Sequence, residues 1–249
     1  MAEKKIKVGI IGAAGYTGGE LIRLLLLHPN AEIVFAQSTS NAGKPISSVH
    51  TDLLGETEQL FSAEHKEDID VLFLCGGHGA AQKFLNDFDV NPNIAIIDLS
   101  HDFRLKEKNE LKGRKFVYGL PELNREAIKE SKNIANPGCF ATAIQLALLP
   151  LAQANLLQND VHVNAITGST GAGQSLSETS HFSWRNNNIS SYKVFTHQHL
   201  SEITESVKQL QTNFANDILF VPQRGNFTRG IFATAYTKFE GSESEAIAL

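Results

Sequence analysis

The chain has 249 residues, which is enough for one large domain or two ordinary ones. Its composition, 42% hydrophobic and 20% charged, is that of a globular protein with a sizeable core, and it argues against intrinsic disorder. A formal net charge of −5 gives no basic field for nucleic acid or an anionic membrane, and no apolar run approaches transmembrane length. Two cysteines exclude a disulfide framework and fit a reducing compartment, so we expect a cytoplasmic protein.

The first half of the chain alternates short apolar runs with helical patterns. Buried strands are expected at residues 6–11, 33–36, 71–75 and 94–99. A helix is expected over Leu21–Leu27, ended by Pro29. Strands buried on both faces are typical of parallel sheets, and their alternation with helices predicts βαβ units. We therefore expect an α/β fold in which residues 1–138 form a Rossmann-type, doubly wound parallel sheet.

The second half changes to a period-two pattern. Polar and apolar residues alternate over 161–167 and 231–238, which predicts antiparallel strands with one covered face. A helical stripe lies between them, and the Gly-, Ser-, Thr- and Asn-rich segment 168–191 is expected to be a functional or mobile loop. We expect residues 139–249 to form an α+β catalytic and oligomerisation domain with a mostly antiparallel sheet. The stripe consists of Leu200, Ile203, Val207 and Leu210.

Three glycines mark a turn between the first predicted strand and the first predicted helix. Gly12, Gly15 and Gly18 stand in the segment GAAGYTG. Glycines at such a turn let a pyrophosphate approach the backbone, and the helix N-terminus offers N–H groups and partial positive charge. We expect a dinucleotide to bind here; the alternative is a turn that serves packing alone.

The end of the second predicted strand bears on which dinucleotide binds. NAD enzymes usually place an acid there to bind the ribose hydroxyls. Here the strand's end reads Gln37, Ser38, Thr39, Ser40, and Glu32 lies at its start. Because hydroxyl groups accommodate a 2′-phosphate that a carboxylate would repel, the sequence favours NADP as the cofactor.

Cys139 follows Asn136-Pro137-Gly138 and precedes an apolar helical stretch. A thiol at a helix N-terminus interacts with the helix dipole, which lowers its pKa and favours the thiolate. A buried structural cysteine is the alternative, and we expect Cys75, at the end of an apolar run, to be of that kind.

Two histidines precede the striped helix at HxH spacing. His197 and His199 raise the question of a metal site, but neither CxxC nor HExxH supplies further ligands, so no metal is expected. The alternative is that one histidine serves Cys139 as an acid–base partner. Glu202, three residues after His199, is placed to orient its ring.

Together these motifs resemble one family, the N-acetyl-γ-glutamyl-phosphate reductases of arginine biosynthesis. The resemblance runs from residue 6 to about residue 240. Aspartate-semialdehyde dehydrogenases share the chemistry and a similar fold but not this set of motifs. The motifs are GAAGYTG at 12–18, IDLSHDFR at 97–104, YGLPEL at 118–123, NPGC at 136–139, GSTGAG at 168–173 and RGI at 229–231.

The resemblance implies an NADP-dependent acyl-phosphate reductase. It would reduce N-acetyl-γ-glutamyl phosphate to the semialdehyde with release of phosphate through a cysteine thioester, and it would form a homo-oligomer, a dimer or a tetramer. A reductase for another N-acyl (for example N-succinyl) or carrier-linked amino-acid acyl phosphate is an alternative. A non-catalytic, NADP-binding redox-sensing module with Cys139 as the sensor thiol is another.

The resemblance also assigns roles to residues. Cys139 would be the nucleophile and His199 the acid–base residue, supported by Glu202. Arginines 185 and 224 are further candidates to hold a phosphate or a carboxylate. The implied cofactor contacts are Gly12, Ala13, Ala14, Gly15, Tyr16, Thr17, Gly18, Ser38, Thr39, Gly77 and His78, and the implied substrate contacts are Arg104, Asn136, Ser169 and Arg229.

The chain departs from the family pattern at several positions. Phe140-Ala141 replaces a common Tyr-Pro after the cysteine. Gln198, Gln174 and Thr39 stand where the family often has a cation. The chain is also expected to stop before the family's C-terminal segment.

Overall fold

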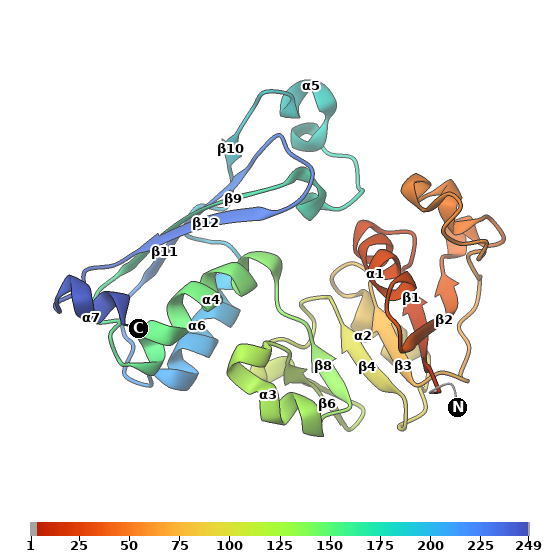
Figure 1. Cartoon of the computed structure of the whole chain (residues 1–249), viewed down its shortest axis with the longest axis horizontal. Helices are drawn as coiled ribbons and strands as arrows, with labels where there is room; N and C mark the ends of the chain where they lie inside the picture. Colours follow the sequence, from red (N-terminus) through yellow and green to blue (C-terminus); the bar gives the residue numbers. More distant parts are fainter. Residues whose placement is uncertain (1–3, 249) are drawn as a thin grey trace. The chain divides into compact units, whose positions relative to one another are not determined.

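The computed structural model describes residues 4–248 and divides into two compact units, one ending at Asn136 and the other beginning at Pro137 (Figure 1). The two units correspond to the two halves in which the sequence pattern differs. Each is described by itself below.

The first unit contains a six-stranded sheet in the order β2-β1-β3-β4-β8-β7, with every pairing parallel. This confirms the predicted doubly wound parallel sheet. Its chain order and bounds are β1 (Ile6–Ile11), β2 (Ala31–Gln37), β3 (Val71–Leu74), β4 (Ala95–Asp98), β7 (Val117–Tyr118) and β8 (Asn133–Ala135). A separate small hairpin joins β5 (Glu110–Leu111) to β6 (Arg114–Lys115).

Helices cover both faces of this sheet, because alternate residues of its strands enter two different cores. Val8 and Ile10 of β1 pack with Ile22 of α1 (Tyr16–Leu26). Leu72 of β3 packs with Leu85 of α2 (Ala80–Asp87). The first helix begins at Tyr16, five residues earlier than its apolar pattern predicts, since the glycine turn leads directly into it. A third helix, α3 (Pro121–Glu130), precedes β8.

The second unit is built on a four-stranded mixed sheet in the order β10-β11-β9-β12. As expected, β9 pairs with β12 in antiparallel orientation. Its neighbour on the other side, β11, runs parallel to β9, because helix α6 lies between the two strands in the chain and returns it to the same end. The strand bounds are β9 (Val161–Thr167), β10 (Ser190–Ser191), β11 (Ile218–Arg224) and β12 (Ile231–Tyr236).

Two long helices, α4 (Cys139–Gln153) and α6 (His199–Leu210), lie side by side against one face of this sheet (Figure 1). Their apolar stripes enter one core, in which Phe140 and Ile203 meet Val163 and Phe220. The predicted stripe of α6 is therefore its buried face. Two short helices, α5 (Phe182–Arg185) and α7 (Glu243–Ile247), lie outside this core.

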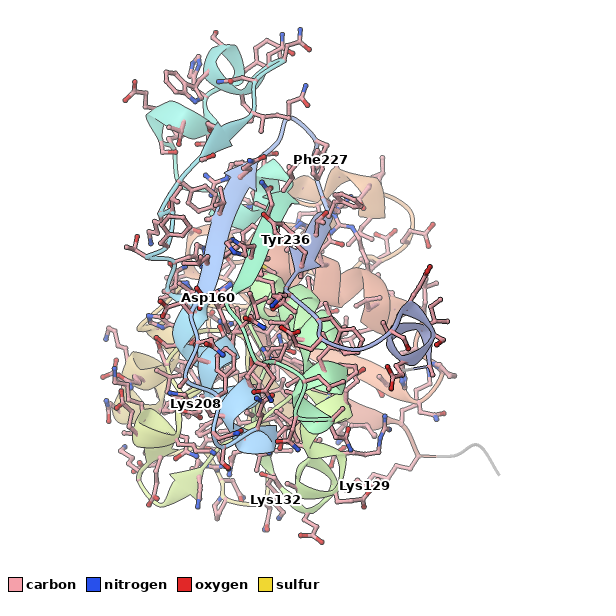
Figure 2. All side chains as sticks on the ribbon, turned by 90° about the vertical axis from the view of Figure 1, so that its left-hand side faces the viewer. Lys129, Lys132, Asp160, Lys208, Phe227 and Tyr236 are labelled. Carbon is pink, nitrogen blue, oxygen red and sulfur yellow. The ribbon has the colours of Figure 1, made fainter. Side chains whose placement is uncertain are left out.

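Within residues 4–248, no helix covers the opposite face of the same sheet (Figure 1). Along β12 the side chains alternate, and Phe232 and Tyr236 on the open face are 71% and 63% exposed. Tyr236 is labelled in Figure 2. The Tyr236 ring stacks on His162 of β9, with centroids 5.0 Å apart. The period-two pattern read from the sequence thus leaves an aromatic surface on the sheet.

No helix within residues 4–248 has both the length and the apolar character needed to span a bilayer.

Candidate active site

The glycine-rich turn joins β1 to α1 in a conformation that requires glycine. Gly12 has φ +77°, and a Cβ there would lie 2.9 Å from the Gly76 nitrogen. A Cβ on Gly18 would lie 2.7 Å from the Ala13 Cα, so this glycine allows the helix to approach the turn closely. The buried His50 ring bonds the Ala13 carbonyl at 2.9 Å and holds the turn from behind. Backbone amides at the start of α1 are the groups that bind a pyrophosphate.

The carboxyl end of β2 lies beside this turn. The Gln37 carbonyl accepts a hydrogen bond from the Ala13 N–H at 2.9 Å. The Gln37 side chain donates to the Thr39 hydroxyl at 3.0 Å, and Ser38 is buried. Glu32 pairs with Lys7 at the opposite end of the strand. The segment Gln37–Ser40 therefore presents hydroxyl groups and no carboxylate.

The loops after β3 and β4 bring two histidines together. The His78 and His101 rings lie 4.1 Å apart, and the His78 Nδ1 accepts from the His101 N–H. The Asp102 carboxylate accepts hydrogen bonds from the Gly79 and Gln82 amides, at 2.8 and 3.1 Å, and from the His101 ring. Burial raises the pKa of Asp102, but these hydrogen bonds outweigh it and hold the pKa below its usual value. Asp102 thus caps α2 and fixes the turn that contains Gly77 and His78.

Arg104 connects two of the predicted substrate contacts. The side chain is buried, and its Nε donates to the Asn136 carbonyl at 2.9 Å, while Nη2 donates to the Leu99 carbonyl at 3.1 Å. The arginine therefore ties the loop after β4 to the segment after β8.

Cys139 is the first residue of α4 and is exposed, whereas the residues on either side of it, Gly138 and Phe140, are buried. The backbone of the preceding Gly138 is extended, so the chain turns into the helix at the cysteine itself. A thiol in this position faces the positive end of the helix dipole, which stabilises a thiolate.

His199 and Glu202 lie against the turn that presents this cysteine. A Cβ on Gly138 would be 2.4 Å from the His199 Nε2 and 2.7 Å from the Glu202 Oε1. The Glu202 carboxylate accepts the Gly138 N–H at 3.1 Å and lies 3.8 Å from the His199 Nε2. Both side chains are buried. The arrangement places an imidazole–carboxylate pair next to the residue that carries the sulfur.

His197 is held in an aromatic environment behind His199. Its ring lies 5.5 Å from Phe140 and 5.8 Å from Tyr192, and its Nδ1 accepts the His199 N–H. Burial, with the charges of His199 and Lys193, lowers the pKa of His197 to about 4. Because the His197 ring stays neutral, it is suited to accept the hydrogen bond from the His199 N–H and not to act as an acid–base group.

The loop after β9 and the turn between β11 and β12 contain the other two predicted substrate contacts. The Ser169 N–H donates to the Phe227 carbonyl at 2.8 Å. A Cβ on Gly168 would lie 2.7 Å from the Arg229 nitrogen, so the loops that carry Ser169 and Arg229 are in contact. Arg185, in contrast, is buried, and its guanidinium donates to main-chain carbonyls and the Ser190 hydroxyl.

Cys75 lies at the end of β3 in the core, and burial raises the pKa of its thiol to about 12. It cannot supply a thiolate near neutral pH. Over the described range 4–248 we find no group of three His, Cys, Asp or Glu side chains arranged to hold a metal ion.

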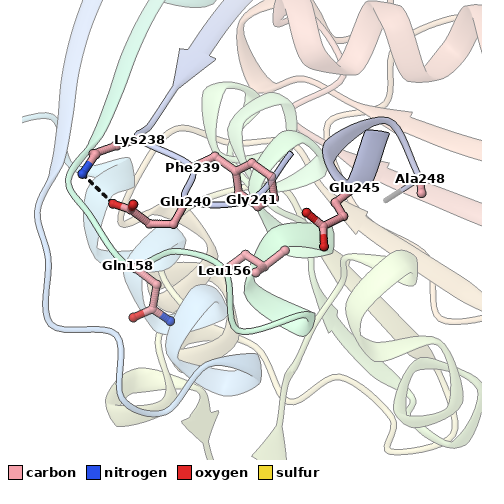
Figure 3. Close-up of a pocket in the computed structure, with 8 residues that line it drawn as sticks. All are labelled: Leu156, Gln158, Lys238, Phe239, Glu240, Gly241, Glu245 and Ala248. Atoms are coloured by element: carbon pink, nitrogen blue, oxygen red, sulfur yellow. Dashed lines mark ion pairs between the residues drawn. The ribbon is translucent and has the colours of Figure 1, made fainter. Parts of the chain in front are cut away.

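A cavity of about 410 Å³ lies elsewhere in the second unit (Figure 3). An ion pair between Lys238 and Glu240, 2.5 Å long, flanks it. None of the predicted site residues lines this cavity. Its lining consists of Leu156, Gln158, Lys238, Phe239, Glu240, Gly241, Glu245 and Ala248.

Sequence reasoning assigned no role to His50, Asp102 or Tyr192. Each acts through a contact with a distant segment: His50 holds the glycine turn, Asp102 caps α2, and Tyr192 packs on His197. The motif IDLSHDFR contains Asp102, but the spacing of its residues does not indicate that Asp102 caps α2.

Two family models match the chain. Residues 7–131 match the semialdehyde dehydrogenase NAD binding domain, and residues 139–248 match the semialdehyde dehydrogenase dimerisation domain.

Curated relatives are similar over nearly the whole chain. The N-acetyl-gamma-glutamyl-phosphate reductase of Flavobacterium johnsoniae is 59% identical over 243 residues, 98% of this chain and 75% of the relative. Those of Christiangramia forsetii and Bacteroides thetaiotaomicron are 56% and 57% identical and are matched over 74% of their lengths, with 97% of this chain covered.

Solved structures share the fold at low sequence identity. Aspartate semialdehyde dehydrogenase II of Vibrio cholerae, complexed with ASA, has a TM-score of 0.73 at 15% identity and covers 99% of this chain and 78% of its own. The Candida albicans aspartate semialdehyde dehydrogenase with NADP has a TM-score of 0.64 at 17% identity, covering 96% and 73%.

Proposed function

Because this chain belongs to the N-acetyl-gamma-glutamyl-phosphate reductases of the semialdehyde dehydrogenase family, we propose that it reduces N-acetyl-γ-glutamyl phosphate to the 5-semialdehyde in arginine biosynthesis. The observation that supports this most strongly is the turn at Gly138, which carries an exposed cysteine on one side and contacts His199 and Glu202 on the other. The partner is then a small acyl phosphate.

Cys139 is the nucleophile of this proposal. Its position at the first residue of α4 stabilises the thiolate, and its exposure leaves the sulfur open to attack an acyl carbon. The sulfur forms a bond to the γ-carbonyl carbon, and the phosphate leaves with the electron pair of the broken C–O bond. The result is a thioester on the enzyme.

His199 is the acid–base residue. The Glu202 carboxylate, 3.8 Å from its Nε2, stabilises the protonated ring and with it an adjacent thiolate. When the thioester has been reduced, the C–S bond breaks, the aldehyde is released and the thiolate is restored beside the imidazole. Glu202 is a positioning residue, since its other oxygen holds the Gly138 amide.

The glycine turn and the end of β2 fit NADP. Gly12 lets the turn pass close to the Cys75–Gly76 backbone, and Gly18 lets the helix approach Ala13, as the tight turn of a dinucleotide site requires. The hydroxyl groups of Ser38 and Thr39 replace the carboxylate that would bind an unphosphorylated ribose. When bound there, NADPH would supply the hydride for reduction of the thioester. Its remaining proposed contacts are Ala13, Ala14, Gly15, Tyr16, Thr17, Gly77 and His78.

Domain roles follow from these assignments. Residues 1–138 bind the cofactor, and residues 139–249 carry catalysis and oligomerisation. Arg104, Asn136, Ser169 and Arg229 contact the substrate in this proposal. Arg104 is held by main-chain carbonyls and Ser169 by a loop contact, so both are already fixed in position before substrate binds.

The open face of the second sheet is the surface we assign to self-association. The matching family model is a dimerisation domain, and Phe232, Tyr236 and His162 lie on the face that no helix of the described residues covers. Burying this aromatic surface against a second copy is favourable because it removes apolar area from water.

A reverse-direction assay tests the function. It follows NADP reduction with N-acetylglutamate semialdehyde and phosphate, with the N-succinyl analogue in parallel. Cys139→Ser should lower kcat by roughly 1,000-fold or more and leave NADPH binding intact, because serine lacks an accessible anionic form. Cys75→Ser is the matched control and should remain active. Near-normal turnover by Cys139→Ser would refute the nucleophile, and saturable NADPH binding without turnover in the wild type would favour a sensing module.

A further inference from the structure

One arginine of the second unit is held beside the proposed reaction centre with unused hydrogen-bonding capacity. Arg224 is the last residue of β11, and its guanidinium carbon lies 4.7 Å over the Tyr192 ring. Its Nε is buried and has no hydrogen-bond partner in the described part of the chain. A buried N–H that is left unsatisfied costs free energy, which a ligand can recover by accepting from it.

Arg185, in the same unit, is an arginine with a structural role and serves as a comparison for Arg224. Its guanidinium nitrogens donate to the carbonyls of Thr179, Asn188 and Arg224 and to the Ser190 hydroxyl. Burial, followed by the charge of Arg224, lowers the pKa of Arg185. The guanidinium of Arg185 is therefore saturated by neutral acceptors, whereas the Nε of Arg224 has none.

The positive charges of Arg185 and Arg224 also interact, since the Arg185 guanidinium donates to the Arg224 carbonyl at 2.6 Å and the charge of Arg224 contributes to the lowered pKa of Arg185. No carboxylate between residues 4 and 248 lies within ion-pair distance of Arg185 or Arg224. Neighbouring guanidinium groups repel one another, and an anion bound at the more accessible one relieves that repulsion. Arg224 is partly exposed, whereas Arg185 is buried.

Tyr192 links Arg224 to the reacting sulfur. The tyrosine ring lies 5.8 Å from that of His197, which contacts His199. Burial raises the pKa of the Tyr192 hydroxyl, the positive charge of Arg224 and a hydrogen bond with its side chain oppose that rise, and the charge of Cys139 adds to it. The phenol is therefore within electrostatic reach of both the guanidinium and the sulfur.

We propose that Arg224, supported by the face of Tyr192, binds a carboxylate of the substrate while the γ-acyl group reacts at Cys139. The inference rests on the proposed function. A planar guanidinium offers pairs of N–H groups in parallel, which match the two oxygens of a carboxylate. The aromatic ring beneath it keeps that edge oriented. The carboxylate is either the α-carboxylate of the glutamyl group or the terminal carboxylate of a dicarboxylic N-acyl group such as succinyl.

The test combines a protein variant with a substrate variant in the reverse-direction assay. Arg224→Met removes the positive charge and the paired N–H donors of the guanidinium. The substrate variant, 4-acetamidobutanal, is N-acetylglutamate semialdehyde without its α-carboxylate. We expect Arg224→Met to raise the KM for the carboxylate-bearing semialdehyde by roughly 10- to 100-fold, with the KM values for NADP and phosphate unchanged. The KM of Arg224→Lys for the semialdehyde should lie between those of wild type and Arg224→Met, because lysine keeps the charge and loses the paired donors.

The two substrates identify which carboxylate is bound. If Arg224 binds the α-carboxylate, wild type and Arg224→Met should use 4-acetamidobutanal equally poorly. If it binds the N-acyl carboxylate, Arg224→Met should lose efficiency only with the N-succinyl semialdehyde. Unchanged KM values for NADP and phosphate in Arg224→Met show that the variant has folded, so a change confined to the semialdehyde is not a folding defect.

Lys208→Met, which removes an exposed cation from α6, is the matched control and should match the wild type. Unchanged kinetics in Arg224→Met with every semialdehyde would overturn the inference, as would a rise confined to the KM for phosphate. A wild type that turns over no semialdehyde would instead overturn the proposed function, and this inference with it.

Discussion

At the residue scale, Gly138 shows how the absence of a Cβ brings the residues of the proposed reaction centre together. Its backbone is extended, with φ −65° and ψ 152°, so other residues could adopt the same conformation. Glycine is required here by packing, because the His199 and Glu202 side chains occupy the space that a Cβ would fill. The contact fixes an imidazole and a carboxylate relative to the cysteine that follows.

Gly138→Ala tests this packing without changing a polar group. The methyl group must displace the His199 Nε2 or the Glu202 Oε1, so we expect kcat to fall at least about tenfold and stability to fall by roughly 1–3 kcal/mol. Steady-state assays and urea unfolding measure the two effects. Gly77→Ala, where a Cβ meets nothing within 4 Å, is the control for stability and should leave it unchanged. Unaltered activity in Gly138→Ala would show that the pair does not depend on this contact.

The lowered pKa of His197 should make the free energy of unfolding fall in mild acid. Its pKa of about 4 lies below the ordinary value near 6.5, so the unfolded chain binds a proton that the folded chain refuses. That contribution is complete above about pH 6.5 and is lost as pH falls toward 4. His197→Gln should therefore lose roughly 1–3 kcal/mol less over this range than wild type.

Urea unfolding followed by circular dichroism at several pH values between 7 and 4 measures this difference. His28→Gln, at an exposed histidine of the first unit, should follow the wild-type curve. A His197→Gln curve parallel to the wild type would contradict the buried neutral state of this ring.

At the scale of elements, α2 depends on a residue that lies outside it. The Asp102 carboxylate accepts from the Gly79 and Gln82 amides, which a helix N-terminus otherwise leaves unsatisfied. Asp102→Ala should lower stability by about 2 kcal/mol and weaken NADPH binding several-fold, because the turn at Gly77 loses its anchor. Thermal unfolding and fluorescence titration with NADPH check both effects. Asp87→Ala, at the exposed end of α2, should change neither; equal losses in both variants would argue against the cap.

Elements with a simple period could be predicted from the sequence, and elements made by distant contacts could not. β1, β9, β12 and the stripe of α6 follow directly from apolar periodicity. The strand β11 was not predicted, because Pro222 interrupts a run that otherwise reads as a strand. The pairing of β11 with β9 depends on side chains that pack together in the core of the second unit. The periodicity of a single segment gives no information on such contacts.

The candidate site divides in the same way. Cys139, the glycine turn and the HxH segment are local motifs, and they were found without the fold. Tyr192 and Arg224 come together only because β10 and β11 pair, which places Ser190 opposite Arg224. A tyrosine outside any quoted motif gives no signal of this kind in the sequence.

At the scale of the molecule, the open sheet face predicts the assembly state. Phe232→Glu introduces a charge at the centre of the aromatic surface and should shift the protein to a 27.2-kDa monomer, because an unpaired buried carboxylate is costly at an interface. Sedimentation velocity over a range of concentrations measures this shift. Leu24→Glu, at an equally exposed position on α1, is the control and should sediment like the wild type. A monomeric wild type would refute the assignment of this face.

The covalent step can be separated from the reduction, because thioester formation needs the acyl phosphate but no reductant. The chain is mixed with N-acetyl-γ-glutamyl phosphate in the absence of NADPH, quenched in acid and digested, and its cysteine peptides are weighed by mass spectrometry. We predict that the peptide containing Cys139 gains the mass of the N-acetylglutamyl group while that of Cys75 does not, and that subsequent addition of NADPH before the quench removes the adduct. An enzyme that reduces the acyl phosphate without ever carrying this adduct, or that carries it on Cys75, would contradict the account.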